Sequence, residues 1–303
     1  MTTVAIHRPT WWQRNQRRLA PYLFISPFYI LFLVFFLGPA LFALFLALHS
    51  WNGIDSMQFV GLRNFTELLT QDEVFLKALR NTAFYSGASL FIVTPISLLL
   101  AVALNAKMVH WKDAFRTIYF TPIVTSTIAI AIVFTVLYNQ RVGLLNMLIE
   151  HLGGQGINWL SSKQWSKISV LGLMTWRWAG FNAIYFLAGL QTIPQTLYEA
   201  AMVDGANRWQ LFWHITLPML RPVILFVAVI VLIGSAQIFD EPYMLTSGGP
   251  QDSSLSIANY LYRVGLNQYL RLGYASAIGF FMFAIIFFFS WIQMRSLGIF
   301  QED

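Results

Sequence analysis

Long apolar runs separated by shorter polar segments dominate the pattern along this chain of 303 residues. Crossing the hydrocarbon layer of a membrane, which is roughly 30 Å thick, takes about 20 helical residues. No water is available there to pair backbone groups, so each run is expected to form an α-helix. The sequence predicts six spans, at residues 22–48, 82–105, 115–138, 168–190, 219–239 and 273–293.

Composition supports a lipid environment. Hydrophobic residues make up 57% of the chain and charged residues 11%, whereas a soluble domain carries about 25% charged residues. The first run is much longer than the 7–15 apolar residues of a secretory signal, so we expect it to be a retained membrane helix. The predicted fold class is an all-α membrane protein with six transmembrane helices.

Residues able to carry catalysis or bind metal are scarce. The chain has no cysteine, which excludes disulfides, thiolate metal sites and cysteine nucleophiles. Its five histidines are scattered without the spacing of metal ligands, and no nucleophile is paired with a base. We therefore expect no catalytic residues, no metal site and no cofactor in this chain.

Basic residues indicate the orientation, because Lys and Arg concentrate on the cytoplasmic side of membrane proteins. A cytoplasmic N-terminus places a small excess of them inside. We expect residues 1–21 to be a cytoplasmic tail, residues 22–303 to form one transmembrane domain, and both termini to be cytoplasmic. Spread in this way, the net charge of +6 does not indicate nucleic-acid binding. Most of the orientation signal comes from Arg8, Arg14, Arg17, Arg18, Lys107, Lys112 and Arg116.

Two prolines and two stripes of small or polar residues lie inside the second and third runs. Pro95 and Pro122 each lack a backbone donor and are expected to kink their helices. Small and polar residues at helical spacing favour close contact between membrane helices over a role in a substrate pathway. The stripes are Thr94, Ser97, Ala101 and Asn105, and Thr127, Ala131, Thr135 and Tyr138.

The segment between the fourth and fifth runs, at about residues 192–218, predicts two short helices joined by a turn. Pro194 suits a first helical turn, Gly205 suits the left-handed position after a helix, and Asn207 is a good N-cap for a second helix. Pro218 is expected to end that helix before the fifth run. On residues alone, an amphipathic surface connection explains this segment equally well.

The same segment resembles the coupling loop, called the EAA loop, of permease subunits in binding-protein-dependent ABC importers. The matching residues are Glu199, Ala200, Ala201, Asp204, Gly205 and Ala206, followed by Ile215, Leu217 and Pro218. Further stretches, at residues 21–24, 59–65, 143–146 and 245–250, resemble the carbohydrate branch of this family. The resemblance is specifically to its maltose-permease-like first subunit.

This resemblance implies several partners in a bacterial or archaeal plasma (inner) membrane. They are a second permease subunit forming a heterodimer, two ATPase subunits that dock on the coupling loop, and an extracytoplasmic substrate-binding protein. The chain has no G-x-x-x-x-G-K-[ST] phosphate loop, and residues 153–156 lack the required lysine. ATP and Mg would therefore be bound by the partner ATPase subunits, and this chain would not itself be an enzyme.

Aromatic and polar residues in the fourth and fifth runs are candidates for a substrate pathway. Aromatic faces and amide groups suit sugars, which stack through C–H patches and pair through hydroxyls. The resemblance places Ser235 at a sugar-contacting position, and Ser235 and Gln237 can line one cavity only if the helix unwinds there. The candidates are Trp176, Arg177, Trp178, Phe181, Asn182, Ser235, Gln237 and Asp240.

Some of these candidates have alternative interpretations. The tryptophans also suit an interfacial aromatic belt, and Arg177 must face a cavity, a partner or the surface, or pair with an acid. We expect Asp240 and Glu241 at the outer mouth, where they would be solvated at a helix end. The leading cargo is a sugar or related polyol.

Other functions remain open. A phosphorylated polyol such as glycerol 3-phosphate is an alternative cargo. An ATP-independent secondary transporter would need coupling carboxylates within the membrane, and a membrane enzyme would need a convergent catalytic set.

Overall fold

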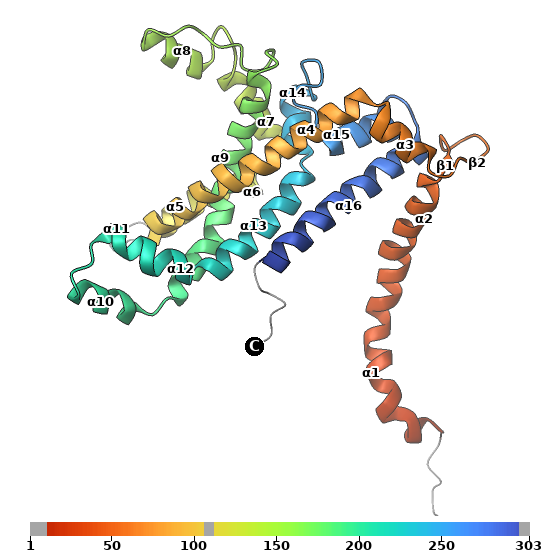
Figure 1. Ribbon diagram of the computed structural model, residues 1–303, viewed down its shortest axis with the longest axis horizontal. Coiled ribbons are helices and arrows are strands. Elements are labelled where there is room, and N and C mark those ends of the chain that lie inside the picture. Colours follow the sequence, from red (N-terminus) through yellow and green to blue (C-terminus); the bar gives the residue numbers. More distant parts are fainter. Residues whose placement is uncertain (1–10, 106–111, 297–303) are drawn as a thin grey trace, which may run out of the picture.

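The computed structural model describes residues 11–105 and 112–296, and these are mainly helical (Figure 1). Their one sheet is an antiparallel pair of two-residue strands, β1 (His49–Ser50) and β2 (Gln58–Phe59). The predicted class, a helical membrane protein, is confirmed at this level. The helices are α1 (Trp11–Phe32), α2 (Gly38–Ala47), α3 (Arg63–Thr70), α4 (Glu73–Ala88), α5 (Thr94–Asn105), α6 (Lys112–Val124), α7 (Thr127–Leu137), α8 (Leu144–His151), α9 (Trp165–Thr192), α10 (Gln195–Val203), α11 (Arg208–Leu211), α12 (Leu217–Met219), α13 (Arg221–Ala236), α14 (Asp240–Thr246), α15 (Ile257–Tyr262) and α16 (Leu272–Ser296), with π-helical turns η1 (Leu33–Leu37), η2 (Ser89–Val93), η3 (Phe212–Thr216) and η4 (Arg263–Asn267).

Helices long and apolar enough to cross a membrane coincide with the predicted runs. Three segments among the described residues meet this condition, Arg17–Ala47, Glu73–Asn105 and Leu272–Arg295, and two bent pairs raise the number to five. The fourth predicted run, at residues 168–190, coincides with α9, an unbroken helix of 28 residues that is about 42 Å long. Lys167 and Arg177 make α9 less apolar than the others, so the count of six spans stays a prediction.

The third predicted span is not one helix. The chain bends by 100° between Val124 and Thr127, where Ser126 is extended (ψ 127°) and precedes α7. Pro122 lies inside α6, and its missing N–H and its ring weaken the helix just before this point. The bend expected at Pro122 is therefore present close to that residue, but as a two-residue break between two helices and not as a kink within one helix.

Three prolines are accommodated by π-helical turns that end two residues before them. Pro39, Pro95 and Pro218 follow η1, η2 and η3. In each turn the last backbone N–H bond spans five residues instead of four, as from Thr94 to Ser89. The wider turn moves away the carbonyl with which a proline ring would clash. Pro95 therefore lies within one segment of 33 residues.

A π-helical turn also precedes Pro218, where the sequence predicted that a helix would end. The helix does not end there but continues to Met219, and the chain bends by 66° only before Arg221. Pro218 lies at the start of α12, where a missing N–H costs little.

Helix α9 is the centre of the bundle and packs against α5, α6, α13 and α14. Ser97 and Ala101 are fully buried in α5, so the first predicted stripe of small residues does serve helix packing. Gly180 allows α6 to approach closely, since a Cβ there would lie 2.0 Å from the Tyr119 carbonyl oxygen.

The two ends of the bundle differ in what they carry. Helices α3, α14 and α15 and the β1–β2 hairpin lie at one end, called here the α15 end (Figure 1). Helices α10, α11 and α12 lie at the other, called the α10 end. Figure 1 also shows the start of α1 and the end of α16 directed toward the side of α10–α12. The start of α1, the end of α16 and the loop at residues 192–218 thus lie toward one side, while the side of the membrane on which the chain termini lie stays a prediction.

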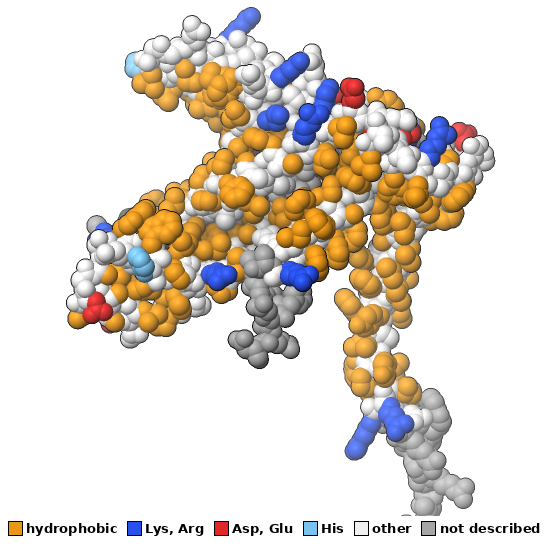
Figure 2. Space-filling view, viewed as in Figure 1, with side chains coloured by type: hydrophobic (Ala, Val, Ile, Leu, Met, Phe, Trp, Pro, Cys, Tyr) orange, Lys and Arg blue, Asp and Glu red, His pale blue; other side chains and the backbone are white. Residues whose placement is uncertain are grey.

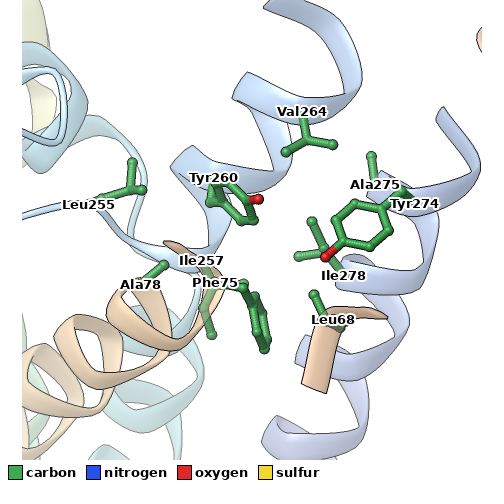
Figure 3. Close-up of a cluster of buried hydrophobic side chains, with 10 residues drawn as sticks. All are labelled: Leu68, Phe75, Ala78, Leu255, Ile257, Tyr260, Val264, Tyr274, Ala275 and Ile278. Atoms are coloured by element: carbon green, nitrogen blue, oxygen red, sulfur yellow. The ribbon is translucent and has the colours of Figure 1, made fainter. Parts of the chain in front are cut away.

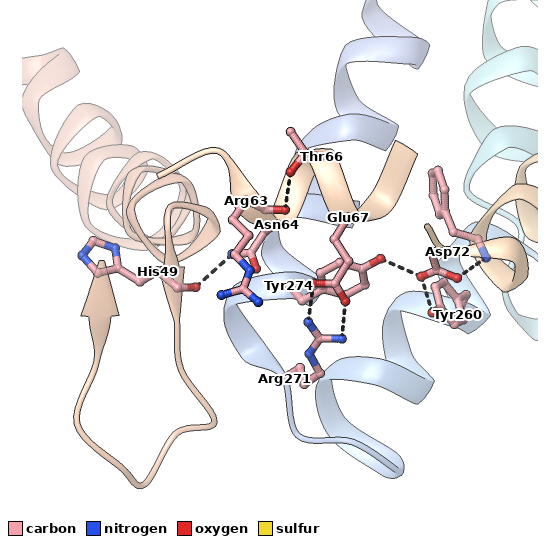
Figure 4. A network of polar contacts seen from close by, with 10 residues as sticks. His49, Arg63, Asn64, Thr66, Glu67, Asp72, Tyr260, Arg271 and Tyr274 are labelled. Carbon is pink, nitrogen blue, oxygen red and sulfur yellow. Dashed lines mark hydrogen bonds and ion pairs between the residues drawn. The ribbon is translucent and has the colours of Figure 1, made fainter. Parts of the chain in front are cut away.

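The α15 end is closed by apolar and polar contacts between distant segments. Its buried apolar cluster joins α3, α4, α15 and α16 (Figure 3). Beside it, the Asp72 carboxylate accepts hydrogen bonds of 2.6 Å from both Tyr260 and Tyr274 and one of 2.9 Å from the Phe75 N–H (Figure 4). Burial, and then the bond to Asp72, raise the pKa of Tyr260 well above its usual range. Asp72 thereby connects α4 to α15 and α16.

The N-terminal helix stands away from the bundle. Along Arg17–Ala47 only 11% of the most apolar window is buried, and Figure 2 shows apolar side chains along the helix and over the bundle. Its contact with the body is made by α2 against α16 and by β1. A helix that is apolar on all sides and largely unburied needs lipid or another protein around it.

Candidate substrate cavity and coupling loop

A cavity of about 570 Å³ lies between α9, α13, η2 and the start of α14. Its walls are mostly apolar, with polar groups gathered where α13 ends. Of the predicted pathway residues, seven line it, namely Arg177, Trp178, Phe181, Asn182, Ser235, Gln237 and Asp240. Trp176 does not; it is 49% exposed and contacts Phe134 instead, at 5.5 Å between ring centroids.

The break after α13 brings its polar residues to the cavity. Helix α13 ends at Ala236, and residues 237–239 are not helical before α14 begins at Asp240. Ser235 and Gln237 would point in different directions on a regular helix. The unwinding places both side chains on the cavity wall. This is the condition under which the sequence allowed both residues to line one cavity.

A buried ion pair forms one wall of the cavity. The Arg177 Nη1 donates to the Glu241 Oε1 at 3.1 Å, and the Trp178 indole Nε1 donates to the same oxygen at 2.8 Å. The exposed fractions of Arg177 and Glu241 are only 9% and 3%. A buried charge without a partner is strongly destabilising, so each of these two charges offsets the free-energy cost of burying the other.

Glu241 is therefore a residue that sequence reasoning misplaced. It was expected in solvent at the outer mouth, but α14 starts immediately after the α13 break and turns this side chain inward. The sequence did contain a signal for a buried acid, because Arg177 lies within an apolar run and needs an acidic partner nearby. Asp240 fits the expectation better, since its side chain is 49% exposed and its Oδ2 lies 3.7 Å from Arg177. Asp240 also accepts from the Thr127 hydroxyl at 3.3 Å.

The predicted helix–turn–helix at residues 192–218 is present at the α10 end. Gly205 has φ +85°, a conformation that suits glycine, and it follows Asp204, the C-cap of α10. Asn207 caps α11 in a reciprocal capping box with Gln210. The Tyr198 and Thr216 hydroxyls are 3.0 Å apart and connect α10 to η3.

The loop residues matched by the resemblance are largely accessible. Glu199, Ala200, Asp204 and Gly205 are exposed. An open hollow of about 300 Å³ lies between α10 and the following helix. Its lining includes Ala201, Asp204, Gly205, Ala206 and Ile215. The two halves of the matched sequence thus form one concave surface, with Leu217 and Pro218 at the base of α13.

Comparison with known proteins places this geometry in a family. Residues 93–295 match the profile of the binding-protein-dependent transport system inner membrane component. The arabinooligosaccharides transport system permease protein AraP of Bacillus subtilis (strain 168) is 39% identical over 95% of this chain and 91% of its own. The lactose transport system permease protein LacF of Rhizobium radiobacter is 35% identical over 90% of this chain and 92% of its own.

A solved structure agrees with these relatives. The crystal structure of a bacterial alginate ABC transporter, in complex with an alginate pentasaccharide-bound periplasmic protein, contains a chain with a TM-score of 0.81 and 28% identity. The match covers 94% of this chain and 96% of that one. Together with the family profile, which spans most of the chain, these similarities show that the protein belongs to the family of inner-membrane components of binding-protein-dependent transport systems.

Proposed function

We propose that this chain is a transmembrane subunit of an ATP-driven importer for a sugar or related polyol. It forms half of the translocation pathway through the cavity beside Trp178, and it couples to cytoplasmic ATPase subunits through the loop at residues 192–218. The observation that carries this proposal is that α13 connects the loop to the cavity. This helix of 16 residues is about 24 Å long; it starts at the bend after the loop and ends at Ala236, next to Ser235.

The cavity has the character of a carbohydrate site. Trp178 and Phe181 present aromatic surfaces, with ring centroids 6.0 Å apart, and Asn182 and Gln237 supply amide groups to the same cavity. Aromatic faces bind the C–H patches of sugars, and amides pair with hydroxyls. The relatives named above, which serve arabino-oligosaccharide, lactose and alginate transport systems, support this substrate class.

The coupling role rests on the hollow in the loop and on the apolar side chains around it. Met202, Val203 and Trp209 are exposed, Trp209 by 69%. Exposed aromatic and aliphatic side chains beside a concave surface are typical of an interface with another protein. A displacement of Gly205 or Ala206 by an ATPase subunit would be transmitted to the start of α13, and along this helix to the cavity wall.

The remaining partners follow from this role. A second permease subunit would complete the pathway and cover part of the exposed α1, and a substrate-binding protein would deliver cargo at the α15 end. ATP and Mg would be bound by the two ATPase subunits. The complex would lie in a bacterial or archaeal plasma membrane.

The test uses the complex purified with its partner subunits through a tag on this chain and reconstituted in vesicles with its binding protein. ATP-dependent uptake is measured with a panel of labelled arabino-, malto- and galacto-oligosaccharides. Gly205→Val is expected to leave assembly intact and to reduce uptake at least tenfold, because a β-branched residue is strained at positive φ.

Gly153→Val is the matched control. Gly153 has φ +83° and, like Gly205, open space around its Cα, but it lies in the turn after α8. Equal loss of uptake in both variants would show only general damage. Unchanged uptake in Gly205→Val, or solute transport in vesicles without the ATPase subunits, would contradict the proposed mechanism.

A further inference from the structure

We infer that the cavity selects against anionic cargo and takes uncharged sugars or polyols. The reason is that its one guanidinium is already neutralised and a further carboxylate faces the opening. This inference rests on the proposed pathway and names its substrate class. It concerns Arg177, Asp240 and Glu241, the charged side chains among the described residues that line the cavity.

The charge of Arg177 is already balanced by carboxylates of this chain. Its Nη1 is bonded to Glu241 and lies near the Asp240 carboxylate. Its Nε is buried without an acceptor among the described residues, so it does not reach the cavity space. A phosphate or uronate on the cargo would compete for this cation with Glu241, a carboxylate that is only 3% exposed and costly to leave without its partner.

Asp240 gives the cavity an excess of negative charge. Two carboxylates stand against one guanidinium, and the second of them, with a half-exposed side chain, lies on the accessible side. Its other described contact is the neutral Thr127 hydroxyl. An anion entering this space therefore meets repulsion that is less screened than in bulk water.

The same arrangement prepares a surface for an uncharged sugar. Because the Trp178 N–H is bonded to Glu241, the indole is fixed in orientation at the cavity wall, and the Arg177 guanidinium lies 5.5 Å from its ring centroid. Glu241 is in this sense a positioning residue for the aromatic surface. The polar groups left for hydroxyls are neutral, from Asn182, Ser235 and Gln237.

Charge is a property on which the relatives differ. Arabino-oligosaccharides and lactose, named in the relatives' transport systems, are uncharged. The solved transporter with a TM-score of 0.81 imports alginate, an acidic polysaccharide. Family membership thus leaves the charge of the cargo undecided. For this cavity the net charge of Arg177, Asp240 and Glu241, one positive and two negative groups, decides it.

The absence of cysteine from the chain allows a direct measurement. Gln237→Cys places a single thiol of this chain on the cavity wall, in the complex purified in detergent with cysteine-free partner subunits. Modification rates are measured with two small methanethiosulfonates, one bearing trimethylammonium and one bearing sulfonate, in nucleotide-free and ATP-bound states. Each rate is divided by the rate for a free thiol in the same buffer. Leu152→Cys, at an exposed position after α8, is the control site.

The expected result is that residue 237 prefers the cationic reagent at least about fivefold over the free-thiol ratio. Adding Asp240→Asn should remove most of this preference, Asp240→Glu should retain it, and neither should change the ratio at residue 152. A ratio at residue 237 equal to that of the free thiol, or favouring sulfonate, would overturn the charge inference and leave the pathway standing. Failure of residue 237 to react in either state while residue 152 reacts would overturn the pathway itself.

Discussion

The two ends of the bundle differ in whether their side chains find partners within this chain. At the α15 end, polar groups from distant segments are bonded to one another, and apolar side chains such as Phe75 and Leu68 are buried within the chain. At the α10 end, α10 buries none of its residues and α11 exposes Trp209. The first region is complete in this chain alone, whereas the second has the composition of a surface that another protein covers. Substitutions at the two ends should therefore damage different properties.

The largest effect is expected for Asp72→Ala. This change removes an N-cap and leaves the Tyr260 and Tyr274 hydroxyls without their acceptor. The loss should lower the free energy of unfolding by about 3 kcal/mol. Thermal unfolding of the purified complex, followed by size exclusion, is the measurement.

Asp204→Ala is its counterpart at the other end. Asp204 is exposed, so its loss should change stability by less than about 0.5 kcal/mol, while ATP-driven uptake falls. Equal destabilisation by the two substitutions would remove the contrast between the ends.

A smaller effect, and one on binding, is expected for Trp209→Ser. An exposed tryptophan at an interface commonly contributes about 2 kcal/mol to association. We expect roughly thirtyfold weaker retention of the ATPase subunits, measured by co-purification at graded protein concentration, with an unchanged unfolding temperature. Retention equal to the wild type would place the ATPase contact away from this aromatic group.

The smallest effect is expected for Glu67→Gln. Glu67 pairs with Arg271 through bonds of 2.8 and 3.0 Å (Figure 4), but the pair is partly exposed. Such pairs contribute about 0–1 kcal/mol, so the unfolding temperature should fall slightly and less so at high salt. A loss as large as that of Asp72→Ala would show that the α15 end depends on its surface charges and not on its buried network.

Local signals allowed much of this structure to be predicted. Apolar runs located the helices because membrane helices must pair their own backbone groups. Gly205 and Asn207 located the turn because positive φ and N-capping are properties of single residues. Most candidate pathway residues reached one cavity because they are neighbours on α9 or lie at the end of α13.

What escaped prediction depends on residues far apart in the sequence. The inward turn of Glu241 needs Arg177, 64 residues earlier, as its partner. The Asp72 network joins residues separated by 188 and 202 positions. The break near Ser126 depends on where α6 and α7 pack, against α9 and α14 respectively, and no local motif records that.

The π-helical turns before Pro39, Pro95 and Pro218 have a consequence for comparing such chains. A π-helical turn holds about one residue more than an α-helical turn, and one residue on an α-helix is about 100° of rotation. Residues after each π-helical turn are therefore rotated by about 100° from the direction that regular α-helical spacing, counted from the residues before the turn, would give them. A homologous helix without the proline has no need of the extra residue, so replacement of the proline and a one-residue deletion in the preceding turn should occur together. An alignment of these spans should place its gaps there, inside the helices.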